Sequence, residues 1–218
     1  MFRTVTFSLA MTALATGCAT TVSDSDTATT DAASISTSDI TEFDRALSTA
    51  DALVEAGNTP TAIDRLTQLL GDPSLTDAQR AVLYFERGKL RMSESGFDVW
   101  GAIADFEKVV DDYPESVVVT ETQDLLGLAR GEATSLNFLL DQPESTRSQR
   151  FSALLRLGEH DDAIDLMLSS NLRPENRELV AMYQIGYLCD GEDQTGPSYS
   201  ATEPDGTRRE LRFCDFGK

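Results

Sequence analysis

Hydrophobic residues recur at helical spacing over residues 40–188. A first stripe runs from Phe43 to Leu53, and Gly57 with Asn58 follows it as a turn. Apolar positions that return every three or four residues mark one face of an amphipathic helix. The pattern therefore predicts a series of short helices over most of the chain.

Capping residues mark where several of these helices begin. Thr59 and Pro60 open a second stripe, because threonine is favoured as an N-cap and proline in the first helical position. Thr76 with Gln79 three residues later has the spacing of a capping box and opens a third stripe. Short turns join neighbouring stripes, so we expect antiparallel helix pairs as the repeated unit.

The clearest copy of this unit spans residues 81–116. Its aromatic, small and helix-ending residues are Tyr84, Gly88, Ala102, Phe106 and Pro114. In type and spacing they resemble a tetratricopeptide repeat. The resemblance implies two closely packed helices, with the small residues at their contact and Phe106 in the seam. Two extra residues separate Gly88 from Ala102, which predicts a longer turn over residues 93–97.

Weaker copies surround Ala62 and Ala163, each of which follows a glycine by five places. The interval from Ala102 to Ala163 is 61 residues, which exceeds one repeat. We therefore expect an irregular helix pair in that interval, near residues 116–130 and 132–140.

Residues 179–188 echo the first helix of the clearest copy, with no second helix after them. This arrangement is typical of a terminal capping helix. The predicted fold class is all-α, with four helix pairs and a cap over residues 40–188. By resemblance, these pairs form a short right-handed tetratricopeptide-like solenoid.

The periodicity changes in residues 189–218, which are rich in turn-forming residues. A turn signal at 203–206 separates two segments with strand character, 198–202 and 207–213. We therefore expect a small C-terminal β-hairpin that packs against the last helix.

Residues 1–17 have the layout of a secretory signal peptide. Arg3 precedes a short apolar stretch, and small residues lead to Cys18. The stretch is too short for a transmembrane helix. The segment Leu14–Cys18 resembles a bacterial lipobox, which implies that Cys18 receives a lipid, palmitate included, and becomes the new N-terminus. The alternative is an ordinary signal peptide cleaved nearby, which leaves a soluble periplasmic protein.

Residues 18–39 are expected to tether the folded part to this anchor. After Cys18 the segment consists almost wholly of Ala, Ser, Thr and Asp, so it cannot bury enough apolar surface to fold. A flexible coil of about 21 residues reaches roughly 25 Å. By the lipoprotein resemblance, Ala19 implies sorting to the periplasmic face of the bacterial outer membrane.

The chain contains three cysteines. With Cys18 lipidated, Cys189 and Cys214 remain as one pair in an oxidising compartment, which predicts a disulfide. Two buried free thiols are the alternative. A metal site at this pair is disfavoured, because no further cysteine and no nearby histidine completes a tetrahedral ligand set.

Charge and residue content narrow the class of function. The 37 acidic and 18 basic residues give a net charge of -19, which repels a nucleic-acid backbone. His160 is the only histidine, and no sequence motif completes a catalytic or metal site around it. The acidic residues Asp111, Asp112 and Glu115 are interpreted as a solvated helix end rather than an acid–base pair. We expect no enzymatic activity, no metal and no cofactor.

A stack of helix pairs presents a concave face that commonly binds a peptide or helix of a partner. Phe85 and Phe97 are candidates for partner contact, because the repeat spacing does not explain them. The resemblance implies a membrane-anchored scaffold that binds protein partners in an envelope assembly. The alternative is that the hairpin at 189–218 binds a small ligand or cell-wall fragment, with the helices as a spacer.

Overall fold

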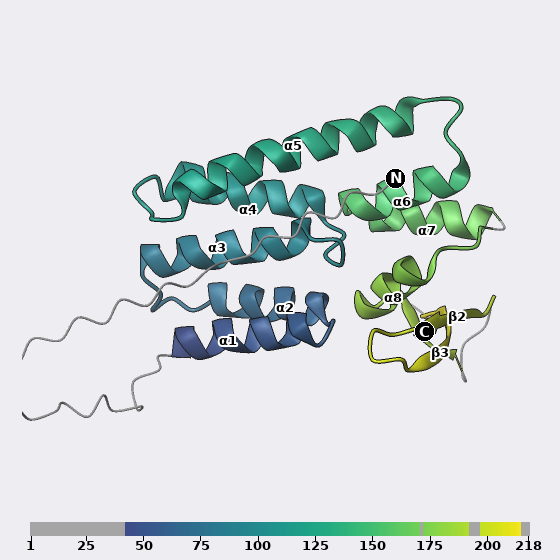
Figure 1. The fold of residues 1–218 in the computed structure, drawn as a ribbon, viewed down its shortest axis with the longest axis horizontal. Coiled ribbons are helices and arrows are strands. Elements are labelled where there is room, and N and C mark those ends of the chain that lie inside the picture. The colour runs from purple at the N-terminus through teal and green to yellow at the C-terminus, as the bar shows by residue number, and fades with distance from the viewer. Residues whose placement is uncertain (1–41, 171, 192–196, 215–218) are drawn as a thin grey trace, which may run out of the picture. The chain divides into compact units, whose positions relative to one another are not determined.

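The structure, a computed structural model, describes residues 42–170, 172–191 and 197–214 (Figure 1). In these ranges eight α-helices precede three β-strands. The helices are α1 (Glu42–Glu55), α2 (Thr59–Leu70), α3 (Asp77–Met92), α4 (Val99–Asp112), α5 (Val119–Asp141), α6 (Arg147–Leu157), α7 (His160–Ser169) and α8 (Asn176–Gln184). The strands are β1 (Leu188–Asp190), β2 (Tyr199–Thr202) and β3 (Arg208–Phe213). The expected signal peptide, Cys18 and tether lie outside the described residues.

Successive helices pack against one another from α1 to α7 (Figure 1). Each of them buries an apolar stripe on its neighbour, as an amphipathic helix must. The last helix, α8, packs against β1 and β2 and shares a buried cluster with α6 and α7. The chain is therefore mostly helical, with a small antiparallel sheet at its C-terminal end. No helix in the described ranges is both long enough and apolar enough to cross a bilayer.

The helix pair expected near residues 116–130 and 132–140 is wrong, because a single 23-residue helix, α5, covers both segments. A lone glycine weakens a helix, but a helix typically ends at a glycine only where that glycine adopts a positive φ. Gly131 does not adopt a positive φ. Ala129 and Ala133 on either side of it are buried in the hydrophobic cluster that contains the α4 core. Packing on α4 therefore carries the helix through the glycine.

The small residues of the clearest repeat lie at helix contacts. A Cβ atom added to Gly88 of α3 would lie 2.5 Å from Cε1 of Phe106 in α4. Tyr84 stacks on Tyr113 with ring centroids 6.2 Å apart, and Pro114 follows Tyr113, the C-cap residue of α4. Fully buried alanines stand at the matching place in three helix pairs: Ala62, Ala102 and Ala163.

A buried ion triad also joins α3 to α4. Asp105 of α4 is 3% exposed and lies between two arginines of α3. Arg87 Nη2 lies 2.6 Å from its Oδ1, and Arg91 Nη1 lies 3.0 Å from its Oδ2. A buried carboxylate requires partners of this kind, because an unpaired charge is costly away from water. The triad therefore fixes the alignment of the two helices.

The strands form one antiparallel sheet in the order β1-β3-β2. β2 and β3 form the expected hairpin. β1, which begins at Leu188 after α8 has ended at Gln184, is a strand that the sequence analysis did not predict. Leu188, Ala201 and Leu211 of the sheet are buried in one cluster with Met182 of α8 and Phe151 of α6. The sheet therefore shares a core with the last helices.

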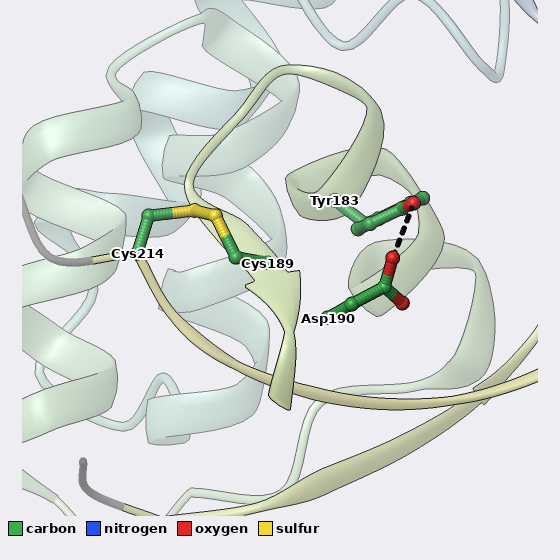
Figure 2. Close-up of a disulfide and its surroundings, with 4 residues drawn as sticks. All are labelled: Tyr183, Cys189, Asp190 and Cys214. Atoms are coloured by element: carbon green, nitrogen blue, oxygen red, sulfur yellow. Dashed lines mark hydrogen bonds between the residues drawn. A yellow bond between two sulfur atoms is a disulfide. The ribbon is translucent and has the colours of Figure 1, made fainter. Parts of the chain in front are cut away.

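A disulfide joins Cys189 of β1 to Cys214, directly after β3, which confirms the predicted pairing (Figure 2). The Cα atoms of the two cysteines are 5.1 Å apart. Figure 2 also shows the Tyr183 hydroxyl of α8 donating a hydrogen bond to Asp190 Oδ2 over 3.3 Å. β1 is thus tied covalently to the end of β3 and by a hydrogen bond to α8.

Candidate functional site

The loop between α3 and α4 holds an aromatic residue in a glycine-like backbone conformation. Phe97 has a φ of 47° and is the only non-glycine residue with a positive φ in the described parts of the chain. Bulky residues rarely adopt this conformation, and they keep it only where surrounding contacts impose it. This loop is also the turn that the sequence shows to be two residues longer than the repeat requires.

Contacts from α6 and α7 impose this loop conformation, and an ion pair with α5 positions the arginine of α6 that makes two of them. Arg156 of α6 donates hydrogen bonds to the carbonyl oxygens of Met92 and Ser93, and its Nε lies 2.6 Å from Glu132 Oε1 of α5. His160 Nε2 donates to the carbonyl oxygen of Phe97 over 2.9 Å. The sole histidine is therefore a support of the loop.

A close approach fixes the far end of the same loop. Asp98 caps α4 by accepting a hydrogen bond from the Gly101 N–H over 2.8 Å, and Arg91 Nε lies 3.3 Å from its Oδ2. Gly158, between α6 and α7, has a φ of 91°, and a Cβ atom there would lie 2.5 Å from Asp98 Oδ1. Only glycine fits this position, because both its φ and its space exclude a side chain.

Two cavities meet at Phe97. The first, of about 540 Å³, lies between the loop, the α1–α2 turn, α8 and the β2–β3 turn. The second, of about 530 Å³, lies between the loop, α5, α6 and the start of α8. Glu94, Phe97 and Arg177 line both, and we call the two cavities together the Phe97 groove. Each has the size of an ordinary ligand-binding pocket.

Four segments that are distant in sequence build the first cavity. Gln184 Nε2 of α8 donates to the Gly57 carbonyl oxygen over 3.0 Å. Gly57 has a φ of 77°, and a Cβ atom there would lie 2.8 Å from Pro204 Cγ in the β2–β3 turn. On the loop side, Thr59 Oγ1 and Ser95 Oγ are 2.7 Å apart. Its apolar lining consists of Gly57, Phe97, Val180, Ala181 and Pro204.

Carboxylates dominate the charged groups of the groove. Glu94 is exposed, and no ion pair or hydrogen bond engages its side chain in the described structure. Arg177 Nε lies 3.3 Å from Glu175 Oε2. Glu178 is buried and accepts hydrogen bonds from Ser152 Oγ and from the Glu175 N–H, the latter over 2.7 Å. The free negative charge of Glu94 therefore lies where the two cavities join.

The structure separates the two aromatic candidates for partner contact. Phe85 is 4% exposed and packs in the core between α3 and α4, with the Lys89 ammonium 4.6 Å from its ring centroid. Phe85 lines neither cavity of the Phe97 groove, and its role in partner contact stays a prediction. Phe97 is 6% exposed and lines both cavities of the groove.

In the described parts of the chain, the acidic residues singled out in the sequence lie outside the Phe97 groove. Within these parts, no three His, Cys, Asp or Glu side chains gather closely enough to hold a metal ion. Asp111, Asp112 and Glu115 lie exposed at the end of α4, where Asp112 pairs with Lys108 one helical turn earlier.

Sequence reasoning missed most of the groove. Val180, Gln184 and Pro204 lie far along the chain from Phe97, and neither their residue types nor their spacing marks them as site residues. The extra length of the turn at 93–97 was the available signal, because repeat packing alone does not require it.

Comparison with protein-family models, with curated protein sequences and with solved structures finds no match to the chain.

Proposed function

We propose that this protein is a binding protein that holds a segment of a partner protein in the Phe97 groove. The main support for this proposal is the loop of Phe97, which is held in an uncommon backbone conformation at the junction of two cavities. Backbone conformations of this kind cluster at functional sites, where surrounding contacts maintain them. The groove offers apolar surface and a free carboxylate, so we expect an apolar segment with a basic residue beside it.

The arrangement of the helices supports a tetratricopeptide-like scaffold. Paired helices with small residues at their contacts are the building unit of that class, and its members bind peptides or helices on one face. The single helix α5 in place of a pair makes this an irregular member of such a class.

We place the protein on the periplasmic face of the bacterial outer membrane, anchored through a lipid on Cys18. The lipobox-like segment before Cys18 and the composition of residues 18–39 support this location. The disulfide between Cys189 and Cys214 supports an oxidising compartment, because cytosolic proteins rarely keep such bonds. The function would then belong to an envelope assembly.

A second candidate is a small ligand or cell-wall fragment bound with help from the C-terminal hairpin. Thr202, Glu203 and Pro204 of the hairpin line the first cavity, which favours this candidate. Deleting the hairpin would not separate the two functions, because the hairpin is both a wall of the groove and part of the core of α8.

A charge reversal at the groove tests the proposal. A photoreactive residue at Ser95, which lines the first cavity, should crosslink one protein in intact cells. Glu94→Arg should abolish that crosslink without changing the melting temperature, because Glu94 is exposed and unpaired. Glu144→Arg is the matched control, since Glu144 is also exposed and lies outside both cavities.

The outcomes separate the candidates. Loss of the crosslink in Glu94→Arg alone supports a protein partner in the groove. Equal capture by both variants would show that the groove is not the site. No captured protein at Ser95 would leave the small-ligand function as the better account of the cavity.

A further inference from the structure

The second surface of interest is the open edge of β2. In the order β1-β3-β2, strand β2 lies at the edge of the sheet. The Glu203 N–H donates to the Thr207 carbonyl oxygen over 2.8 Å, which sets the alternation of the antiparallel ladder. Every second residue of β2 then turns its N–H and C=O away from β3. These residues are Ser200 and Thr202, opposite Glu210 and Arg208.

One of these two positions is already occupied by a side-chain amide. The Thr202 N–H donates to Asn176 Oδ1 over 2.6 Å, and Asn176 Nδ2 donates to the Thr202 carbonyl oxygen over 2.8 Å. The amide thus makes the pair of hydrogen bonds that one residue of an added antiparallel strand would make. The edge at Thr202 is therefore shaped to receive a backbone.

The next position along the edge is open. Ser200 is exposed, and its outward N–H and C=O meet no partner in the described structure. A groove of about 650 Å³ lies beside it, between β2 and the residues around the end of α7. Leu168 on the opposite wall is 57% exposed, and Met167 and Leu179 add buried apolar surface. Unpaired strand edges beside apolar surface are sites where another strand adds.

Among the described residues that line this groove, the one charged side chain is basic. Arg173 lines the same groove, is exposed and has no ion-pair partner in the part of the chain that the structure describes. In a chain of net charge -19, a free guanidinium here favours an occupant that carries a carboxylate. A second copy of the chain is disfavoured as the occupant, because two strongly negative molecules repel each other.

We infer that the open edge of β2 binds an extended segment of a partner protein as an added strand. The segment exchanges two main-chain hydrogen bonds with Ser200, sets an apolar side chain against Leu168 and directs a carboxylate to Arg173. Asn176 occupies the outward N–H and C=O of Thr202, so the added strand cannot pair beyond Ser200 in that direction. The site therefore binds a short segment. This site does not depend on the Phe97 groove, although Asn176 also lines the first cavity of that groove.

A peptide selection on the purified full chain tests the inference. The probe is a phage-displayed random heptapeptide library, and the enriched peptides are then titrated as free peptides. We expect alternating apolar residues with an acidic residue at one end. Ser200→Pro should weaken these peptides at least about tenfold, because it removes the N–H donor and blocks the edge. Ser200→Ala should bind as the parent chain does, because the contact is to the backbone.

Two further variants test the two ends of the site. Asn176→Ala frees Thr202, so peptides that extend past Ser200 should bind about two- to tenfold more tightly. Arg173→Glu should reverse the preference for an acidic end. Circular dichroism and melting temperature verify that each variant is folded, and proline is tolerated at an edge position whose N–H is unbonded.

The inference is overturned if no peptide is enriched over a selection without protein, or if Ser200→Pro binds the enriched peptides as tightly as Ser200→Ala. The Glu94→Arg variant should bind the same peptides as the parent chain. Loss of peptide binding in that variant would show that the peptides occupy the Phe97 groove, which also overturns the inference.

Discussion

Phe97 combines a glycine-like backbone with a buried aromatic ring, and its neighbours explain how it keeps both. His160 holds its carbonyl oxygen, and Arg156 holds the carbonyl oxygens at the start of the loop. Each hydrogen bond contributes about 1 kcal/mol, of the same order as the cost of a left-handed non-glycine residue. The residues that support the loop therefore come from α6 and α7, far along the chain from Phe97.

The pKa of Tyr199 provides a testable prediction about a single residue. Burial raises the pKa of its phenol above the ordinary value of about 10. The folded chain therefore keeps this proton at a pH at which the unfolded chain releases it. The resulting stability is complete below pH of about 10 and is lost as the pH rises through the raised pKa.

Tyr199→Phe should consequently lose less free energy of unfolding than the parent chain between pH 8 and pH of about 11. The ring remains, so its edge-on contact with Phe213, at 6.0 Å between centroids, is kept. Urea unfolding at several pH values measures the difference. Equal losses in the two chains would contradict the assigned cause.

At the scale of elements, two glycines in helices have opposite roles. Gly88 lies against Phe106 where α3 meets α4, whereas the Cβ position of Gly131 in α5 opens to empty space. A helical glycine costs about 1 kcal/mol relative to alanine where nothing requires it. At Gly88 alanine is the less favourable residue, because the contact with Phe106 leaves no room for a methyl group.

The same substitution at both positions separates these roles. Gly88→Ala should lower the free energy of unfolding by about 1 to 3 kcal/mol through overpacking against Phe106. Gly131→Ala should raise it by about 0.5 to 1 kcal/mol through helix propensity. Urea denaturation of both variants provides the test. A stabilised Gly88→Ala variant would show that α3 and α4 adjust to the added methyl group.

At the scale of the whole described part, the turn between α1 and α2 contacts the turn between β2 and β3. Gly57 lies against Pro204, and Gln184 donates to the Gly57 carbonyl oxygen. The disulfide between Cys189 and Cys214 ties together the sheet that carries Pro204. The first cavity of the Phe97 groove therefore depends on residues from both ends of the described chain.

Removal of the disulfide should affect stability and binding together. Its cysteines are 25 residues apart, for which loop-closure entropy gives roughly 3 to 4 kcal/mol. The paired variant Cys189→Ser with Cys214→Ser should lose about this much free energy of unfolding and should crosslink less partner at Ser95. A reducing agent should reproduce the loss in the parent chain and change nothing further in the double variant.

The sequence predicted the elements more closely than their arrangement. The helix stripes, the capping box at Thr76 and the hairpin all depend on residues within a few positions of one another. The prediction was wrong for α5, because burial of Ala129 and Ala133 beside the α4 core outweighed the helix-breaking tendency of Gly131. Strand β1 was missed because a strand of three residues is too short to show an alternation of apolar and polar positions.

The sequence by itself determined that most of the chain forms amphipathic helices, that Gly88 lies at a helix contact and that the two cysteines pair. Each of these follows from local spacing or from residue type. Only the tertiary structure decided that Phe85 is core while Phe97 lines a groove, and that Ser200 faces an open edge. Such properties depend on which distant segments approach one another. A one-dimensional pattern specifies which faces must be buried, but not which segments cover them.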